Sequence, residues 1–91
     1  MLSGKEKRAL RAQGNLLKAE LWVGKEGISP GTVQSLKNSF NTKELVKIKL
    51  QENCPTDKRE VAEALCAETG AELVQILGNT ILLYHPLPEE S

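Results

Sequence analysis

The sequence has few of the residues on which enzymes and metal sites depend. Histidine occurs once, at His85, and aspartate once, at Asp57. The only cysteines, Cys54 and Cys66, stand twelve positions apart without a CxxC pair, whereas a structural zinc site needs four ligands. No nucleophile accompanies a base and an orienting acid in a recognisable pattern. We therefore expect neither catalysis nor a metal site, and no cofactor or small-molecule substrate.

Long apolar segments are also missing. No apolar run approaches the roughly 18 residues of a membrane span, and the N-terminus turns polar within five residues, unlike a signal peptide. We expect a cytoplasmic protein with free thiols, because a reducing cytosol disfavours disulfides. The length suits one domain. We place this domain at residues 1–86, followed by a flexible tail at residues 87–91, and expect a monomer without membrane contact.

Aromatic residues number only three, Trp22, Phe40 and Tyr84, so the core must be aliphatic. Phe40 belongs to an apolar stripe at helical spacing and is predicted to lie in the core. Trp22 has two possible positions. It could face the open side of a sheet and meet a nucleic-acid base, or it could pack under the first helix, which is the favoured alternative.

The charges balance overall but not along the chain. Residues 1–50 hold ten Lys and Arg and four Asp and Glu, a net charge of +6. Residues 51–91 hold two and eight, a net charge of −6. This asymmetry indicates a basic working face and an acidic solubilising one. Alternatively, the charges intermix once the chain has folded.

Periodicity and capping signals predict the element order α-β-α-β-α-β-β. A capping box at residues 3–6 begins the first helix and Gly14 ends it, residues 29–30 begin the second, and residues 55–57 begin the third, which Gly70 ends. Strands separated by helices should be parallel and a terminal hairpin antiparallel. We therefore expect a two-layer α/β sandwich with a mixed four-stranded sheet. Its strands should be residues 20–23, 44–51, 72–77 and 80–85.

The best functional candidate is the loop Gly24-Lys25-Glu26-Gly27, between a strand and a helix start. Glycines let a backbone approach a ligand closely, and the helix should direct free N–H groups at the same space. A GxxG loop leading into a helix is how KH domains clamp a nucleic-acid backbone. Alone the motif is weak, because most such glycine pairs are plain turns. Further basic residues could extend it into a surface of several phosphate contacts, namely Arg8, Arg11, Lys47 and Lys49.

Five segments of the chain carry a resemblance to a known family: residues 9–11, 22–29, 44–49, 69–71 and 82–84. In order and spacing they resemble the CRM domain family (chloroplast RNA splicing and ribosome maturation), in particular its bacterial single-domain YhbY-like members. The resemblance implies a fold like the C-terminal domain of the third bacterial translation initiation factor, with strand order 1-2-4-3 and the fourth strand antiparallel. It also implies RNA binding through the GxxG loop.

Two features depart from the family pattern. Gly14-Asn15 stands where the family often has Ala-His, and Glu26 puts a carboxylate into the loop, which weakens its electrostatic attraction for phosphate but not its backbone contacts. We expect a non-catalytic RNA-binding protein that acts on ribosomal RNA or on precursors of the large ribosomal subunit. The alternative is a protein–protein interaction module that docks a ribosomal protein through the acidic third helix, with the loop purely structural.

Overall fold

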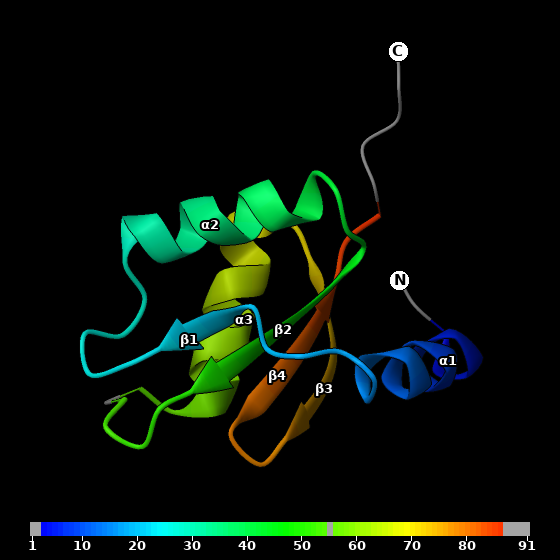
Figure 1. Ribbon diagram of the computed structural model, residues 1–91, viewed down its shortest axis with the longest axis horizontal. Coiled ribbons are helices and arrows are strands. Elements are labelled where there is room, and N and C mark those ends of the chain that lie inside the picture. Colours follow the sequence, from blue (N-terminus) through cyan, green and yellow to red (C-terminus); the bar gives the residue numbers. More distant parts are fainter. Residues whose placement is uncertain (1–2, 55, 87–91) are drawn as a thin grey trace.

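The structure, a computed structural model, describes residues 3–54 and 56–86. Over these residues the elements follow the order predicted from the sequence (Figure 1). They are α1 Gly4–Gly14, β1 Leu21–Val23, α2 Pro30–Phe40, β2 Leu45–Leu50, α3 Lys58–Thr69, β3 Glu72–Leu77 and β4 Thr80–Tyr84. The predicted tail at residues 87–91, and Pro55 at the predicted start of the third helix, lie outside the described residues.

The four strands form one mixed sheet in the order β1-β2-β4-β3. β1 and β2 are parallel and are connected through α2, whereas β4 runs antiparallel to both of its neighbours. The β3–β4 connection is the two-residue turn Gly78-Asn79, in which Gly78 has a φ of +58°. Helical crossovers and a terminal hairpin were expected from the sequence, and the strand order is the one that the resemblance implied. The predicted α/β fold is confirmed.

The main core lies between the sheet and the pair α2 and α3. Alternation along β2 directs Val46, Ile48 and Leu50 into this core, where they are 5% exposed or less. Leu36 and Phe40 meet them from α2, which confirms Phe40 as a core residue. Full burial of one such aliphatic or aromatic side chain stabilises the fold by about 1.5–3 kcal/mol. The core is mainly aliphatic, as expected from the small number of aromatic residues.

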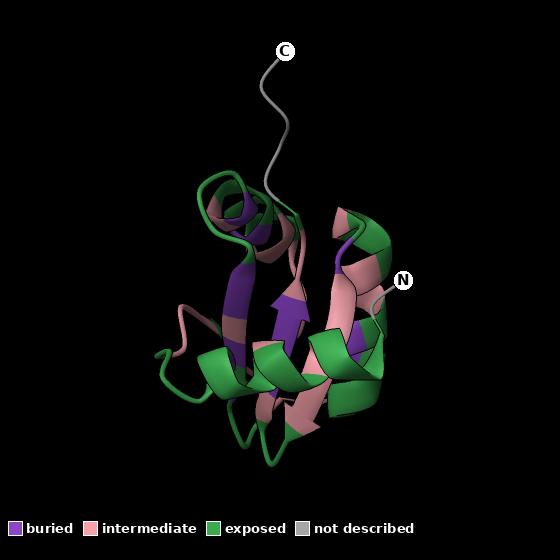
Figure 2. Cartoon of the chain, turned by 90° about the vertical axis from the view of Figure 1, so that its right-hand side faces the viewer, coloured by how far each residue is buried: buried purple, intermediate pink, exposed green. Residues whose placement is uncertain are grey.

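α1 lies across the opposite face of the sheet, with most of its surface exposed (Figure 2). Its Leu10 packs against a second, smaller cluster of Leu45, Val74 and Leu82. The end of α1 approaches the sheet so closely that a Cβ on Gly14 would lie 2.4 Å from the Cδ2 atom of Leu82. Glycine at this position lets the helix end dock. The sandwich of α2, α3 and sheet thus carries one additional helix on its other side.

The helix ends follow their capping signals. The side chain of Ser3 accepts a hydrogen bond from the Glu6 N–H at 3.1 Å, where the capping box was predicted. At α3 the carboxylate of Asp57 accepts the backbone N–H of Arg59 at 3.2 Å, within the segment 55–57 that was predicted to begin this helix. Gly70 ends α3 in the left-handed region, with a φ of +76°.

Candidate functional site

The glycine loop forms a tight turn directly after β1. The N–H of Gly27 donates to the carbonyl of Gly24 at 2.9 Å, which closes a four-residue turn. Gly27 has a φ of +69°, a conformation that glycine adopts without strain. Lys25 and Glu26 occupy the two central positions and are exposed. The turn therefore presents these two residues to solvent at one end of the molecule (Figure 1).

The tip of this loop keeps its polar groups unpaired. Among the described residues, neither the side chains nor the backbone N–H groups of Lys25 and Glu26 make a hydrogen bond or an ion pair. One ammonium and two adjacent N–H donors form a suitable site for a phosphate oxygen, since successive backbone N–H groups in a turn bind anions. The carboxylate of Glu26 opposes this attraction.

The N-terminus of α2 offers fewer donors than the sequence indicates. Pro30 has no N–H, and the N–H of Thr32 donates to the Ser29 hydroxyl at 3.2 Å. The Thr32 hydroxyl in turn accepts the Ser29 N–H at 3.4 Å, so a capping box uses both groups. The N–H of Gly31 is the one donor in this first turn that no described residue pairs. The helix start therefore offers fewer free N–H groups than the sequence indicates. An anion at this site would rely mainly on the N–H groups and the ammonium of the loop, with a smaller contribution from the helix dipole.

Lys47 and Lys49 share one face of β2, as predicted, but their ammonium groups have different surroundings. The Nζ of Lys47 donates to the carbonyls of Gly14 and Leu17, both at 3.2 Å. These carbonyls lie at the end of α1 and in the segment that leads to β1, so Lys47 fastens α1 to the sheet. Lys49 is exposed and makes no hydrogen bond or ion pair with any described residue. Of the two, Lys49 is the one available to a ligand.

Replacing Lys47 by Met should lower the free energy of unfolding by about 1–2 kcal/mol, because two carbonyl groups lose a charged donor. Urea denaturation followed by circular dichroism measures this change. Lys49→Met is the matched control on the same strand face and should shift stability by less than about 0.5 kcal/mol. Equal stability losses in both variants would contradict a structural role specific to Lys47.

Arg8 and Arg11 are exposed on α1 but do not lie beside the loop. α1 and the loop stand at opposite ends of the longest axis of the molecule (Figure 1). The structure therefore does not bring all the predicted basic residues together. A ligand that contacts both the loop and these arginines has to extend along the length of the domain.

Trp22 lies on the open face of the sheet. Its neighbours Leu21 and Val23 pack toward the core under α2 and α3, so the indole between them points the other way. The side chain is 56% exposed and its strand position is paired with Lys49. Packing under the first helix, which the sequence favoured, is wrong, because α1 covers a different part of this face.

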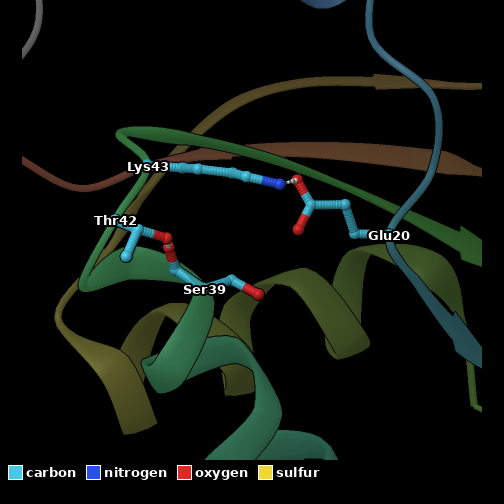
Figure 3. A network of polar contacts seen from close by, with 4 residues as sticks. All are labelled: Glu20, Ser39, Thr42 and Lys43. Atoms are coloured by element: carbon cyan, nitrogen blue, oxygen red, sulfur yellow. Dashed lines mark hydrogen bonds and ion pairs between the residues drawn. The ribbon is translucent and has the colours of Figure 1, made fainter.

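Lys43, a further residue of the basic half, is engaged in an ion pair. Its Nζ lies 2.9 Å from the Oε1 of Glu20 (Figure 3). Beside it, the hydroxyl of Thr42 donates to the carbonyl of Ser39 at 3.4 Å. The pair joins the segment before β1 to the connection between α2 and β2. A partly exposed pair of this kind contributes about 0–1 kcal/mol to stability.

The remaining reactive side chains are two cysteines and one histidine. Cys54 and Cys66 are free thiols. Burial raises the pKa of the Cys66 thiol, with smaller contributions from Glu72 and Glu63, so the less reactive protonated form is favoured. The His85 ring packs against Phe40 at 5.4 Å between centroids. Within residues 3–54 and 56–86, no three His, Cys, Asp or Glu residues form a group that could hold a metal ion.

The family model for the CRS1 / YhbY (CRM) domain matches residues 2–85. The chain belongs to this family. This confirms the family resemblance found in the sequence.

Individual CRM-domain relatives cover nearly the whole chain. "Probable RNA-binding protein YqeI" of Bacillus subtilis is 40% identical over 92% of this chain and 88% of its own length. "Probable RNA-binding protein PA4753" of Pseudomonas aeruginosa is 32% identical, over 97% and 85%. The solution structure of SAV1595 from Staphylococcus aureus matches with a TM-score of 0.83 and 34% identity, over 100% of this chain and 95% of the other. The two curated relatives are named as RNA-binding proteins and not as enzymes, in agreement with the expectation from the sequence.

Proposed function

We propose that this chain is a non-catalytic RNA-binding protein that holds the phosphate backbone at the loop Gly24-Lys25-Glu26-Gly27. One observation carries the proposal, namely that the exposed turn presents an ammonium and two successive N–H donors that no described residue pairs. The names of the curated relatives support RNA as the ligand.

The turn itself explains why donors remain available. The N–H of Gly27 is used internally, against the carbonyl of Gly24, which fixes the backbone of the loop. The N–H groups of Lys25 and Glu26 then bind phosphate oxygens, and the Lys25 ammonium supplies the charge. Each neutralised phosphate releases counterions, so RNA affinity falls as the salt concentration rises.

The proposed target is ribosomal RNA, in precursors of the large ribosomal subunit, as the resemblance to bacterial single-domain members of the family implies. The proposed place of action is the cytoplasm, as expected from the composition of the sequence. We further propose that a monomer is the binding species, since the loop site is formed by residues of one chain.

Two neutral substitutions of adjacent loop residues test the proposal. Lys25→Gln should weaken binding to fragments of large-subunit ribosomal RNA whatever their sequence. It should also reduce the slope of log affinity against log salt concentration by about one unit or less. Glu26→Gln removes a charge of the opposite sign from the neighbouring position and should strengthen binding about two- to fivefold. Fluorescence anisotropy of labelled RNA at two salt concentrations measures both effects.

Opposite signs in these two variants would support an electrostatic contact at the loop tip. Unchanged RNA affinity in both variants would remove the loop from the mechanism. Salt-insensitive binding to a ribosomal protein, without RNA binding, would instead favour docking through α3, whose exposed acidic residues include Glu60, Glu63 and Glu68.

A further inference from the structure

One row of side chains on the outer face of the sheet lies beyond the residues that α1 covers. The strand register aligns one residue from each strand across the sheet: Trp22 of β1, Lys49 of β2, Thr80 of β4 and Leu77 of β3. Their neighbours along the strands pack into the main core on the other side, namely Val23, Leu50, Ile81 and Ile76. We call these four aligned residues the stacking row.

The stacking row combines exposed apolar surface with a cation that pairs with no described residue. Trp22 and Leu77 are 56% and 65% exposed, although both are large hydrophobic residues. Lys49 lies between them in the register and is exposed. The row contains no acidic residue. An aromatic face beside a cation, on a sheet surface, provides the two contacts that single-stranded nucleic acid requires, base stacking and phosphate neutralisation.

The stacking row is also continuous with the loop. Only Val23 separates Trp22 from Gly24, and Lys49 pairs with Trp22 across the parallel strands. Since consecutive Cα atoms are about 3.8 Å apart, the backbone of Lys25 and Glu26 lies within about 15 Å of the Trp22 backbone. A short single-stranded segment can therefore reach both the loop and the indole. Neighbouring strands are about 4.8 Å apart, so the row measures about 14 Å from Trp22 to Leu77. It has room for one or two nucleotides.

We infer that the stacking row binds an unpaired RNA base, with Trp22 as the stacking surface and Lys49 as the contact to an adjacent phosphate. The inference rests on the proposed function, because the loop delivers the RNA backbone to the row. A duplex keeps its bases paired and stacked inside, so the ligand class is single-stranded RNA. The domain should therefore prefer an unpaired segment to a helix of the same sequence.

The indole of Trp22 reports on this contact directly, because it is the single tryptophan of the chain. Titration with a short single-stranded oligouridylate should quench its fluorescence. Inorganic polyphosphate, which carries the charge but no base, should leave the emission unchanged. Trp22→Ala should weaken binding of the labelled single strand about 5- to 100-fold, while Trp22→Phe should retain most of the affinity. Leu16→Ala, at an exposed leucine outside the row, should bind like the wild type.

The outcomes separate the stacking row from the loop. If Trp22→Ala, shown to be folded by circular dichroism, binds the single strand like the wild type and the wild-type emission is unchanged on binding, the row is not a base site. Binding that still depends on Lys25 would then leave the loop proposal intact. If the wild type binds neither single-stranded nor double-stranded RNA, the proposed function and the stacking row both fail.

Discussion

Gly27→Asp is expected to lower RNA affinity at least about tenfold while the fold stays intact. The substitution places a carboxylate in the turn that meets the phosphate, and a tenfold loss corresponds to only about 1.4 kcal/mol of repulsion. The φ of +69° at this position is one that Asp tolerates better than most residues. An added Cβ would have the Thr56 hydroxyl at 3.7 Å, an ordinary contact. Anisotropy with labelled RNA measures the loss.

Gly70→Asp is the matched control for this experiment. Gly70 has a φ of +76°, and a Cβ there would lie 3.8 Å from the Nε2 atom of His85, so the strain and the space resemble those at Gly27. Gly70 stands just before Glu72, the first residue of β3, which pairs with Tyr84 at the end of β4. This end of the sheet is the one away from the glycine loop. Its RNA affinity should remain at the wild-type level. Equal losses in the two variants would mean that added negative charge, and not the loop, determines binding.

The elements of this fold were predictable because their signals are local. Alternation along β2 and the Ser-Pro start of α2 each depend on a few consecutive residues. The different roles of Lys47 and Lys49 were not predictable in this way. Both stand on the same strand face, and only the contacts of Lys47 with carbonyls some thirty positions earlier in the chain distinguish them. Whether a side chain is available to a ligand depends on its tertiary contacts, and strand periodicity does not predict these.

The position of Trp22 shows the same limit. Alternation indicates that it faces away from Leu21 and Val23, but it does not indicate whether a helix covers that side. The answer depends on where α1 docks, and the close approach of Gly14 to Leu82 places α1 over other residues. The capping box at α2 did have a local signal, because Thr32 stands three residues after Ser29. Its presence could have warned that the helix start has few free N–H groups.

Leu36→Ala should produce the largest loss of stability among these variants. Leu36 is 0% exposed, and it packs from α2 into the core above β2. Truncating a leucine at such a site removes its transfer free energy and leaves a cavity, at a cost of about 2–5 kcal/mol. A domain of this length has a total stability of roughly 5–14 kcal/mol. The midpoint of thermal unfolding should therefore fall by roughly 8–40 °C, as followed by circular dichroism.

Leu16→Ala makes the same chemical change at a leucine that is 88% exposed, and its stability should stay within about 0.5 kcal/mol of the wild type. Well below its own melting temperature, Leu36→Ala should bind RNA like the wild type, because Leu36 belongs to neither the loop nor the stacking row. Full stability in Leu36→Ala would contradict the packing of α2 against the sheet. Weak RNA binding by a fully folded Leu36→Ala would instead show that α2 holds the glycine loop in place. RNA binding at the loop and packing of the core would then be energetically coupled.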